Sequence, residues 1–93
     1  MKQKISHMSE NFKILSNDVR LCILSNLYRN GESKVNQLQE CAGVSQSLVS
    51  QQLSKLRIAN IISADKRGNE VYYSIKNEEI KRIIKIIIFK ELE

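Results

Sequence analysis

Two neighbouring segments restrict the possible folds of this sequence more than any others, the polar stretch Val44–Arg57 and the basic turn segment Lys66–Asn69. Apolar residues recur in the first segment at the three- and four-residue steps of a helix with one buried face. They are Leu48, Val49, Leu53 and Leu56. Farther along, Val71, Tyr73 and Ile75 fall at every second position, as in a half-buried strand. The pattern predicts a helix followed by a two-stranded hairpin with a basic tip.

Capping residues divide the rest of the chain into further helices. Asn17, Ser45 and Asn77 carry the side-chain oxygens that helix N-termini favour, and we expect Ser33 to begin another helix that ends at Gly43. An amphipathic first helix precedes these, because apolar residues fall at three- and four-residue steps, namely Ile5, Met8, Phe12 and Leu15. For the hairpin we expect a partner strand that opens at Ile61 and Ile62 and a turn over residues 65–69.

This order of elements is that of a winged helix-turn-helix, mainly α with a small β-hairpin. We expect four helices, two strands and a last helix in one domain over residues 1–93. The segment Ile80–Leu92 is too short to span a membrane and contains several basic residues. Its apolar residues occupy more than one helix face, which favours a homodimer interface over the core helix of a monomer.

Composition narrows the function further. The chain has 93 residues and a formal net charge of +5, which favours a polyanionic partner. Two cysteines and no recognisable signal peptide favour the reducing cytoplasm. One histidine, two aspartates and no glycine-rich phosphate loop give little basis for an enzyme, and we expect no cofactor.

The polar side of the helix within Val44–Arg57 is the candidate for reading DNA. Amide and hydroxyl groups of this kind match base edges in the major groove, and the candidates are Gln46, Ser47, Ser50, Gln51 and Ser54. Basic residues beyond them are candidates for phosphate contacts, namely Lys55, Arg57, Lys66 and Arg67. The alternatives are a merely solvated helix face or a winged helix that docks onto other proteins. Double-stranded DNA is therefore the expected partner, and we expect no membrane partner.

Taken together, these segments resemble the ArsR/SmtB family of bacterial repressors. The resemblance rests on segments that extend from about Phe12 to the C-terminus, namely Leu15–Leu21, Ile23–Leu24, Val44–Leu53, Leu56–Arg57, Arg67–Gly68 and Val71–Tyr73. It implies a homodimer with the first and last helices at the interface. It also implies binding to an imperfect palindrome and repression that an inducer relieves.

The inducer positions of the family depart from the usual pattern. Thiolate positions of its metal sensors fall on Lys34, Asn36 and Gln39, and the last-helix metal positions fall on Asn77, Glu79, Lys90 and Glu93. Neither set offers the imidazole and thiolate ligands that zinc favours, so we expect no metal site. His7, the single histidine, is expected at the surface of a frayed N-terminal segment.

The cysteines leave one alternative open, a repressor that senses oxidants through Cys22 and Cys41. Family members that sense oxidants through thiols place one on the second helix and one on the last. This chain has no cysteine in its last helix, and the second-helix position of those members falls nearer Ser25. Whether Cys22 and Cys41 lie close enough to react is left open by the sequence, because disulfide geometry is strict.

Overall fold

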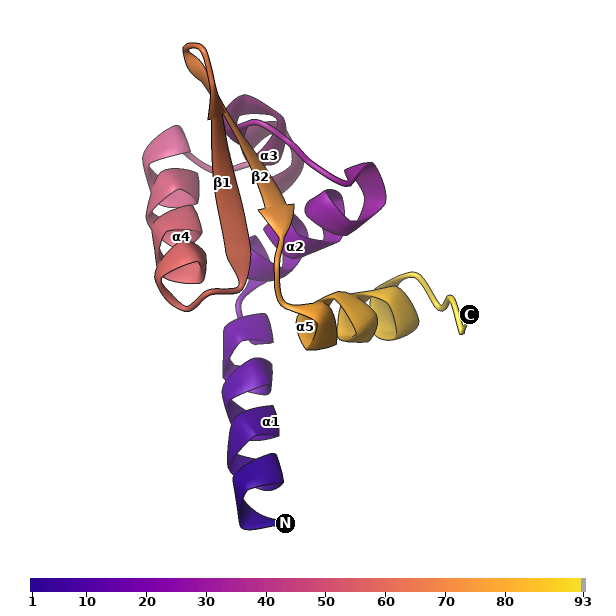
Figure 1. The fold of residues 1–93 in the computed structure, drawn as a ribbon. Coiled ribbons are helices and arrows are strands. Elements are labelled where there is room, and N and C mark those ends of the chain that lie inside the picture. The colour runs from indigo at the N-terminus through magenta and orange to yellow at the C-terminus, as the bar shows by residue number, and fades with distance from the viewer. Residues whose placement is uncertain (93) are drawn as a thin grey trace.

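The computed structural model describes residues 1–92 and shows four helices, a two-stranded hairpin and a last helix (Figure 1). The first four helices are α1 (Lys2–Leu15), α2 (Asp18–Asn30), α3 (Val35–Ala42) and α4 (Gln46–Ile58). The antiparallel hairpin, which we call the wing, consists of β1 (Ile62–Arg67) and β2 (Glu70–Ile75). The last helix is α5 (Glu78–Ile83), which continues as the π-helical turn η1 (Ile84–Ile88). The predicted winged helix-turn-helix is confirmed.

Three of the predicted helix caps are present. Side-chain oxygens of Asn17, Ser45 and Asn77 accept hydrogen bonds from backbone N–H groups at the starts of α2, α4 and α5. Gly43 ends α3 in the left-handed conformation with φ of 66°, which permits the tight corner into α4. These local signals fix the helix-turn-helix corner.

The expected start of α3 at Ser33 is wrong, because Ser33 belongs to the wing. Its N–H donates to the Tyr73 carbonyl at 3.0 Å, and Tyr73 N–H donates back to the Ser33 carbonyl at 2.9 Å. Its hydroxyl donates to Oδ1 of Asn26 at 2.7 Å. With its backbone paired to β2, Ser33 cannot cap a helix, and α3 begins at Val35 instead.

The wing turn is also tighter than expected. β1 runs to Arg67, which pairs with Glu70, so the turn consists of Gly68 and Asn69 rather than residues 65–69. Gly68 has φ of 63°, a conformation that two-residue hairpin turns require and that glycine adopts without strain. The shorter turn extends the paired strands almost to the tip (Figure 1).

A single buried cluster joins α2, α3, α4, β1 and the last helix. Its residues are Ile23, Leu24, Leu27, Leu38, Val49, Leu53, Leu56, Ile61, Ile62, Ile80 and Ile84. Burial of this apolar surface holds α4 by its inner face and leaves the outer face in solvent. Leu48, which was expected inward, is only partly buried.

Helix α1 extends away from this body, at the end of the molecule opposite the wing tip (Figure 1). The N-terminal segment is helical from Lys2, so the expectation that His7 lies in a frayed segment is wrong. His7 remains exposed, but its Nε2 lies 2.5 Å from Oε1 of Glu79 on α5. Asn11 Nδ2 donates to the same carboxylate oxygen at 3.3 Å. A carboxylate on α5 thus fixes α1 against the last helix.

The last segment is helical, as expected, but it widens into the π-helical turn of η1. Ile84 is buried in the core, whereas Ile86, Ile87 and Ile88 are exposed. Within residues 1–92, no helix is both long enough and apolar enough to cross a membrane.

Candidate nucleic-acid interface

Helix α4 presents all five predicted base-reading side chains to solvent. Gln46, Ser47, Ser50, Gln51 and Ser54 are exposed, while Val49, Leu53 and Leu56 on the other side are buried. Within residues 1–92, none of the five side chains makes a hydrogen bond to another residue of the chain. Their donors and acceptors are therefore available to an external ligand.

One residue of α4 that the sequence interpretation passed over is Gln52. It is only 6% exposed, although its neighbour Gln51 points to solvent. Its Oε1 accepts a hydrogen bond from Nη1 of Arg20 on α2 at 2.9 Å. The signal for its burial was helical spacing, since Gln52 lies four residues before the buried Leu56 and three after the buried Val49.

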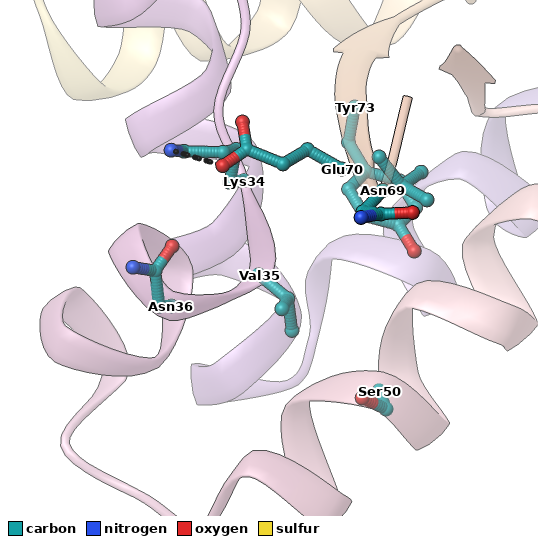
Figure 2. Close-up of a pocket in the computed structure, with 8 residues that line it drawn as sticks. Lys34, Val35, Asn36, Ser50, Asn69, Glu70 and Tyr73 are labelled. Atoms are coloured by element: carbon teal, nitrogen blue, oxygen red, sulfur yellow. Dashed lines mark hydrogen bonds and ion pairs between the residues drawn. The ribbon is translucent and has the colours of Figure 1, made fainter. Parts of the chain in front are cut away.

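The region between α3, α4 and the wing contains an open cavity of about 320 Å³ (Figure 2). Lys34, Val35 and Asn36 line it from α3 and the turn before it, Ser50 lines it from α4, and residues 69–71 and Tyr73 line it from the wing. A second hollow on α4, of about 180 Å³, includes Ser50, Ser54 and Arg57. The two hollows share Ser50, Val71 and Tyr73 in their linings, so both lie between α4 and the wing.

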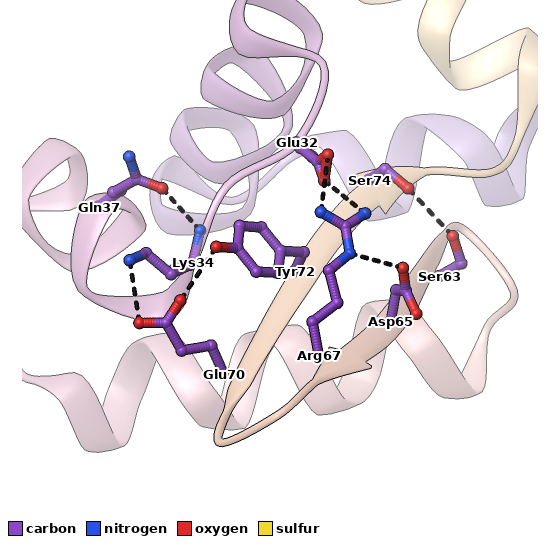
Figure 3. A network of polar contacts seen from close by, with 9 residues as sticks. All are labelled: Glu32, Lys34, Gln37, Ser63, Asp65, Arg67, Glu70, Tyr72 and Ser74. Carbon is purple, nitrogen blue, oxygen red and sulfur yellow. Dashed lines mark hydrogen bonds and ion pairs between the residues drawn. The ribbon is translucent and has the colours of Figure 1, made fainter.

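The wing contains a polar network around Arg67 (Figure 3). Its guanidinium lies 2.8 Å from Glu32, 2.9 Å from Asp65 and 4.3 Å from the centre of the Tyr72 ring. The two carboxylates raise the pKa of Arg67 further, first through the hydrogen bond to Glu32. Arg67 is therefore engaged within the protein as well as exposed.

A second part of the same network surrounds Glu70. Its carboxylate accepts hydrogen bonds from the Tyr72 hydroxyl at 2.9 Å and from Nζ of Lys34 at 3.3 Å, and both lower its pKa. Lys34 and Arg67 are thus balanced by nearby carboxylates. Lys55, Arg57 and Lys66 are exposed and form no ion pair within residues 1–92.

The two cysteines, whose distance the sequence left open, are neighbours. The Sγ of Cys41 on α3 lies 3.8 Å from the Cys22 carbonyl oxygen on α2. Both thiols are free, with Cys41 exposed and Cys22 half-buried. Burial raises the pKa of Cys22 to about 11, and the Cys41 thiol adds to the rise.

Three of the family's metal positions hold side chains that have other partners. Lys34 pairs with Glu70, Asn77 caps α5, and Glu79 accepts from His7 and Asn11. Glu93 lies outside the described residues. In the part of the chain that the structure describes, no three His, Cys, Asp or Glu side chains are grouped to hold a metal ion.

Known bacterial regulatory proteins match this sequence. The family model described as "Bacterial regulatory protein, arsR family" matches residues 17–64. The transcriptional repressor PagR of Bacillus anthracis is 35% identical over 89 residues, which covers 90% of this chain and 89% of PagR. The arsenical resistance operon repressor of Bacillus subtilis is 33% identical over 75 residues, covering 81% of this chain and 71% of that protein.

Among solved structures, the transcriptional regulator HlyU from Vibrio vulnificus superimposes with a TM-score of 0.89 at 34% identity. The superposition covers 97% of this chain and 93% of HlyU. The sequence match, the winged fold and the free polar face of α4 agree with one another. The chain therefore belongs to the arsR family of bacterial regulatory proteins, and it is a DNA-binding transcriptional regulator rather than an enzyme.

Proposed function

We propose that this protein represses transcription by binding an operator as a homodimer, with α4 of each protomer in the major groove. The observation that carries the proposal is the exposed and uncommitted polar face of α4. A glutamine amide can pair with both Hoogsteen-edge groups of adenine, and a serine hydroxyl can donate or accept at most base edges. The repressor names of PagR and the Bacillus subtilis relative support repression over activation.

Basic residues flank this face where they would meet the DNA backbone. Lys55 and Arg57 lie in the last turns of α4, and Lys66 and Arg67 lie near the wing tip. We assign Lys55, Arg57 and Lys66 to phosphates, because their charges have no partner within residues 1–92. Arg67 has two roles at the wing in this proposal. It contributes positive charge for the DNA backbone, and its ion pairs with Glu32 and Asp65 stabilise the wing.

Exposed apolar residues on α1 and the last helix supply the dimer interface in this proposal. Phe12 and Ile87 are 56% and 66% exposed, which is costly for a lone protomer in water. A hollow of about 240 Å³ between the two helices is lined almost entirely by apolar side chains. Two protomers related by a twofold axis would present two copies of α4 to half-sites about one DNA turn apart, hence a palindromic operator.

Selection of bound duplexes from a random pool tests this proposal. The expected result is a recovered site with twofold symmetry whose half-site centres are about 10 base pairs apart. Affinity for that site should fall steeply with salt and exceed affinity for a scrambled duplex. A pool that shows no enrichment would favour the alternative of a protein-docking winged helix.

The contact between Cys22 and Cys41 favours a second candidate, the same repressor with release triggered by oxidation. Exposed Cys41 would attack a hydroperoxide as the thiolate, forming a sulfenic acid and releasing an alcohol or water. Cys22 would then displace water to form the disulfide. The raised pKa of Cys22 assigns the first attack to Cys41.

Peroxide treatment followed by DNA titration tests the oxidation candidate. If oxidation triggers release, the treated protein should lose the mass of two hydrogens and bind the operator more weakly. Both effects should be absent in Cys41→Ser and Cys22→Ser. Unchanged operator binding by fully oxidised protein would remove the candidate and leave the repressor proposal intact.

We propose no metal inducer and no cofactor for this chain, because the family's ligand positions carry neither imidazole nor thiolate and three of them, Lys34, Asn77 and Glu79, have other partners. Zinc titration against a competing chelator tests this part. The expected result is no binding tighter than about micromolar and no release of DNA. A repressor of bacterial genes acts where the DNA is, so we place its action in the cytoplasm.

A further inference from the structure

A partly buried polar contact lies between α1, α2 and α4, and the proposed function does not use it. Arg20 on α2 donates from Nε to the Ile14 carbonyl at 2.8 Å and from Nη2 to the Lys13 carbonyl at 3.3 Å. Its Nη1 donates to Gln52 Oε1 at 2.9 Å. One guanidinium thus joins the C-terminal end of α1 to the middle of α4.

The two carbonyls that Arg20 binds are among the last of α1, although the Lys13 carbonyl also accepts from the N–H and the hydroxyl of Ser16. The last carbonyls of an α-helix have no partner within it, and the negative end of its dipole attracts a cation. Arg20 satisfies these carbonyls at the point where the chain turns from α1 into α2. A lysine cannot make the same connection, because it lacks the fixed fork of donors.

On α4, the contact reaches the residue beside the predicted base reader. Gln52 is 6% exposed and directly follows Gln51, about 100° around the helix. A polar side chain held at a buried position resists rotation of the helix about its axis, because rotation would leave the amide and the guanidinium without partners. Purely apolar contacts on the inner face are less directional.

Helix α1 otherwise packs mainly on α2 and meets α5 through Glu79. We infer that Arg20 and Gln52 are positioning residues that transmit the placement of α1 to the rotation of α4, and hence to sequence discrimination. This inference rests on the proposed function, in which α1 packs against the partner protomer and α4 reads the DNA.

Variants at position 52 test the inference in the full-length protein. Gln52→Leu removes the acceptor at similar volume, whereas Gln52→Glu keeps an acceptor for Arg20. Affinity is measured for the selected operator and for a scrambled duplex, together with dimer mass and melting temperature. Gln52→Leu should lower the operator-to-scrambled ratio about tenfold with dimer mass unchanged, and Gln52→Glu should keep the ratio within about twofold. A ratio that Gln52→Leu leaves unchanged, or that both variants lower equally, would overturn the inference.

Two further measurements separate this inference from the proposed function. Arg20→Lys should lower the same ratio, and its effect should not add to that of Gln52→Leu if the two residues act as one unit. Without DNA, amide hydrogen exchange in the last turns of α1 should accelerate several-fold in Gln52→Leu and not in Gln52→Glu. Unchanged exchange would contradict the link to α1. A wild-type protein with no preferred sequence would contradict the proposed function, and the exchange result would still decide whether the link exists.

Discussion

Ser33 and Tyr73 exchange both of their backbone hydrogen bonds, at 3.0 and 2.9 Å. The loop before α3 thereby forms an isolated antiparallel β-bridge with β2. Because the same loop carries Glu32 and Lys34, this pairing also brings their side chains to Arg67 and Glu70 of the wing. The position of the wing relative to the helix-turn-helix depends on this pairing.

Ser33→Ala should lower the free energy of unfolding by about 1 kcal/mol, because the buried hydroxyl loses its hydrogen bond to Asn26. Urea titration followed by circular dichroism measures the change. Ser63→Ala is the matched control, since its hydroxyl meets Ser74 at the exposed surface and its loss should cost less than about 0.5 kcal/mol. Equal losses for the two variants would contradict the assigned role of Ser33.

Ile87→Glu should convert the dimer to a monomer in sedimentation at micromolar concentration, because it places a charge in the proposed interface. Ile87 is 66% exposed in the protomer, so the variant should keep its helical circular dichroism. Ile58→Glu is the control, since Ile58 is 79% exposed at the end of α4 and does not line the apolar hollow between α1 and the last helix. A monomeric unmutated protein would contradict the proposed interface.

Glu79→Gln should reduce stability at neutral pH and have no effect in strong acid. The hydrogen bond from His7, followed by that from Asn11, lowers the pKa of Glu79. A carboxyl with a lowered pKa contributes stability above its ordinary value of 4.5, and this contribution is lost as pH falls through the lowered pKa. Unfolding curves from pH 7 down to about 2 should therefore converge for the two proteins. Curves that stay parallel over this range would contradict the assigned role of the Glu79 carboxylate as acceptor of these hydrogen bonds.

Lys66→Ala should weaken binding to operator and scrambled duplexes alike and lower the salt slope by about one for each wing that contacts DNA. Arg67→Ala should also weaken binding to every sequence, because Glu32 and Asp65 would then face the phosphates without a cation. Arg67→Ala should in addition lower the melting temperature, which Lys66→Ala should not. A loss confined to the operator would show that Lys66 reads bases instead.

The parts of the fold that sequence predicted correctly depend on neighbours within a few residues. Asn17, Ser45 and Asn77 cap helices through groups three positions away. The predicted start of α3 is wrong because Ser33 pairs with Tyr73, and no residue near Ser33 in sequence indicates this contact.

In the candidate site too, features that depend on local sequence were predictable and contacts between distant residues were not. The exposed face of α4 followed from helical periodicity, because helical spacing separated most buried residues from exposed ones. The sequence predicts a phosphate contact for Arg67. It does not predict the ion pair with Glu32, which is 35 residues away in sequence and depends on the folded loop. Helical spacing indicates the burial of Gln52, but its hydrogen bond with Arg20 depends on the packing of α2 on α4.

Base reading by α4 is tested by the affinity of the Gln51→Ala variant for matched and scrambled duplexes. Gln51 is exposed and free of contacts within residues 1–92, so its loss should leave folding, dimer mass and salt slope unchanged. Operator affinity should fall by about 1–3 kcal/mol per half-site, and affinity for the scrambled duplex should stay the same. Equal losses on both duplexes, or no loss on either, would contradict the claim that this face of α4 discriminates sequence.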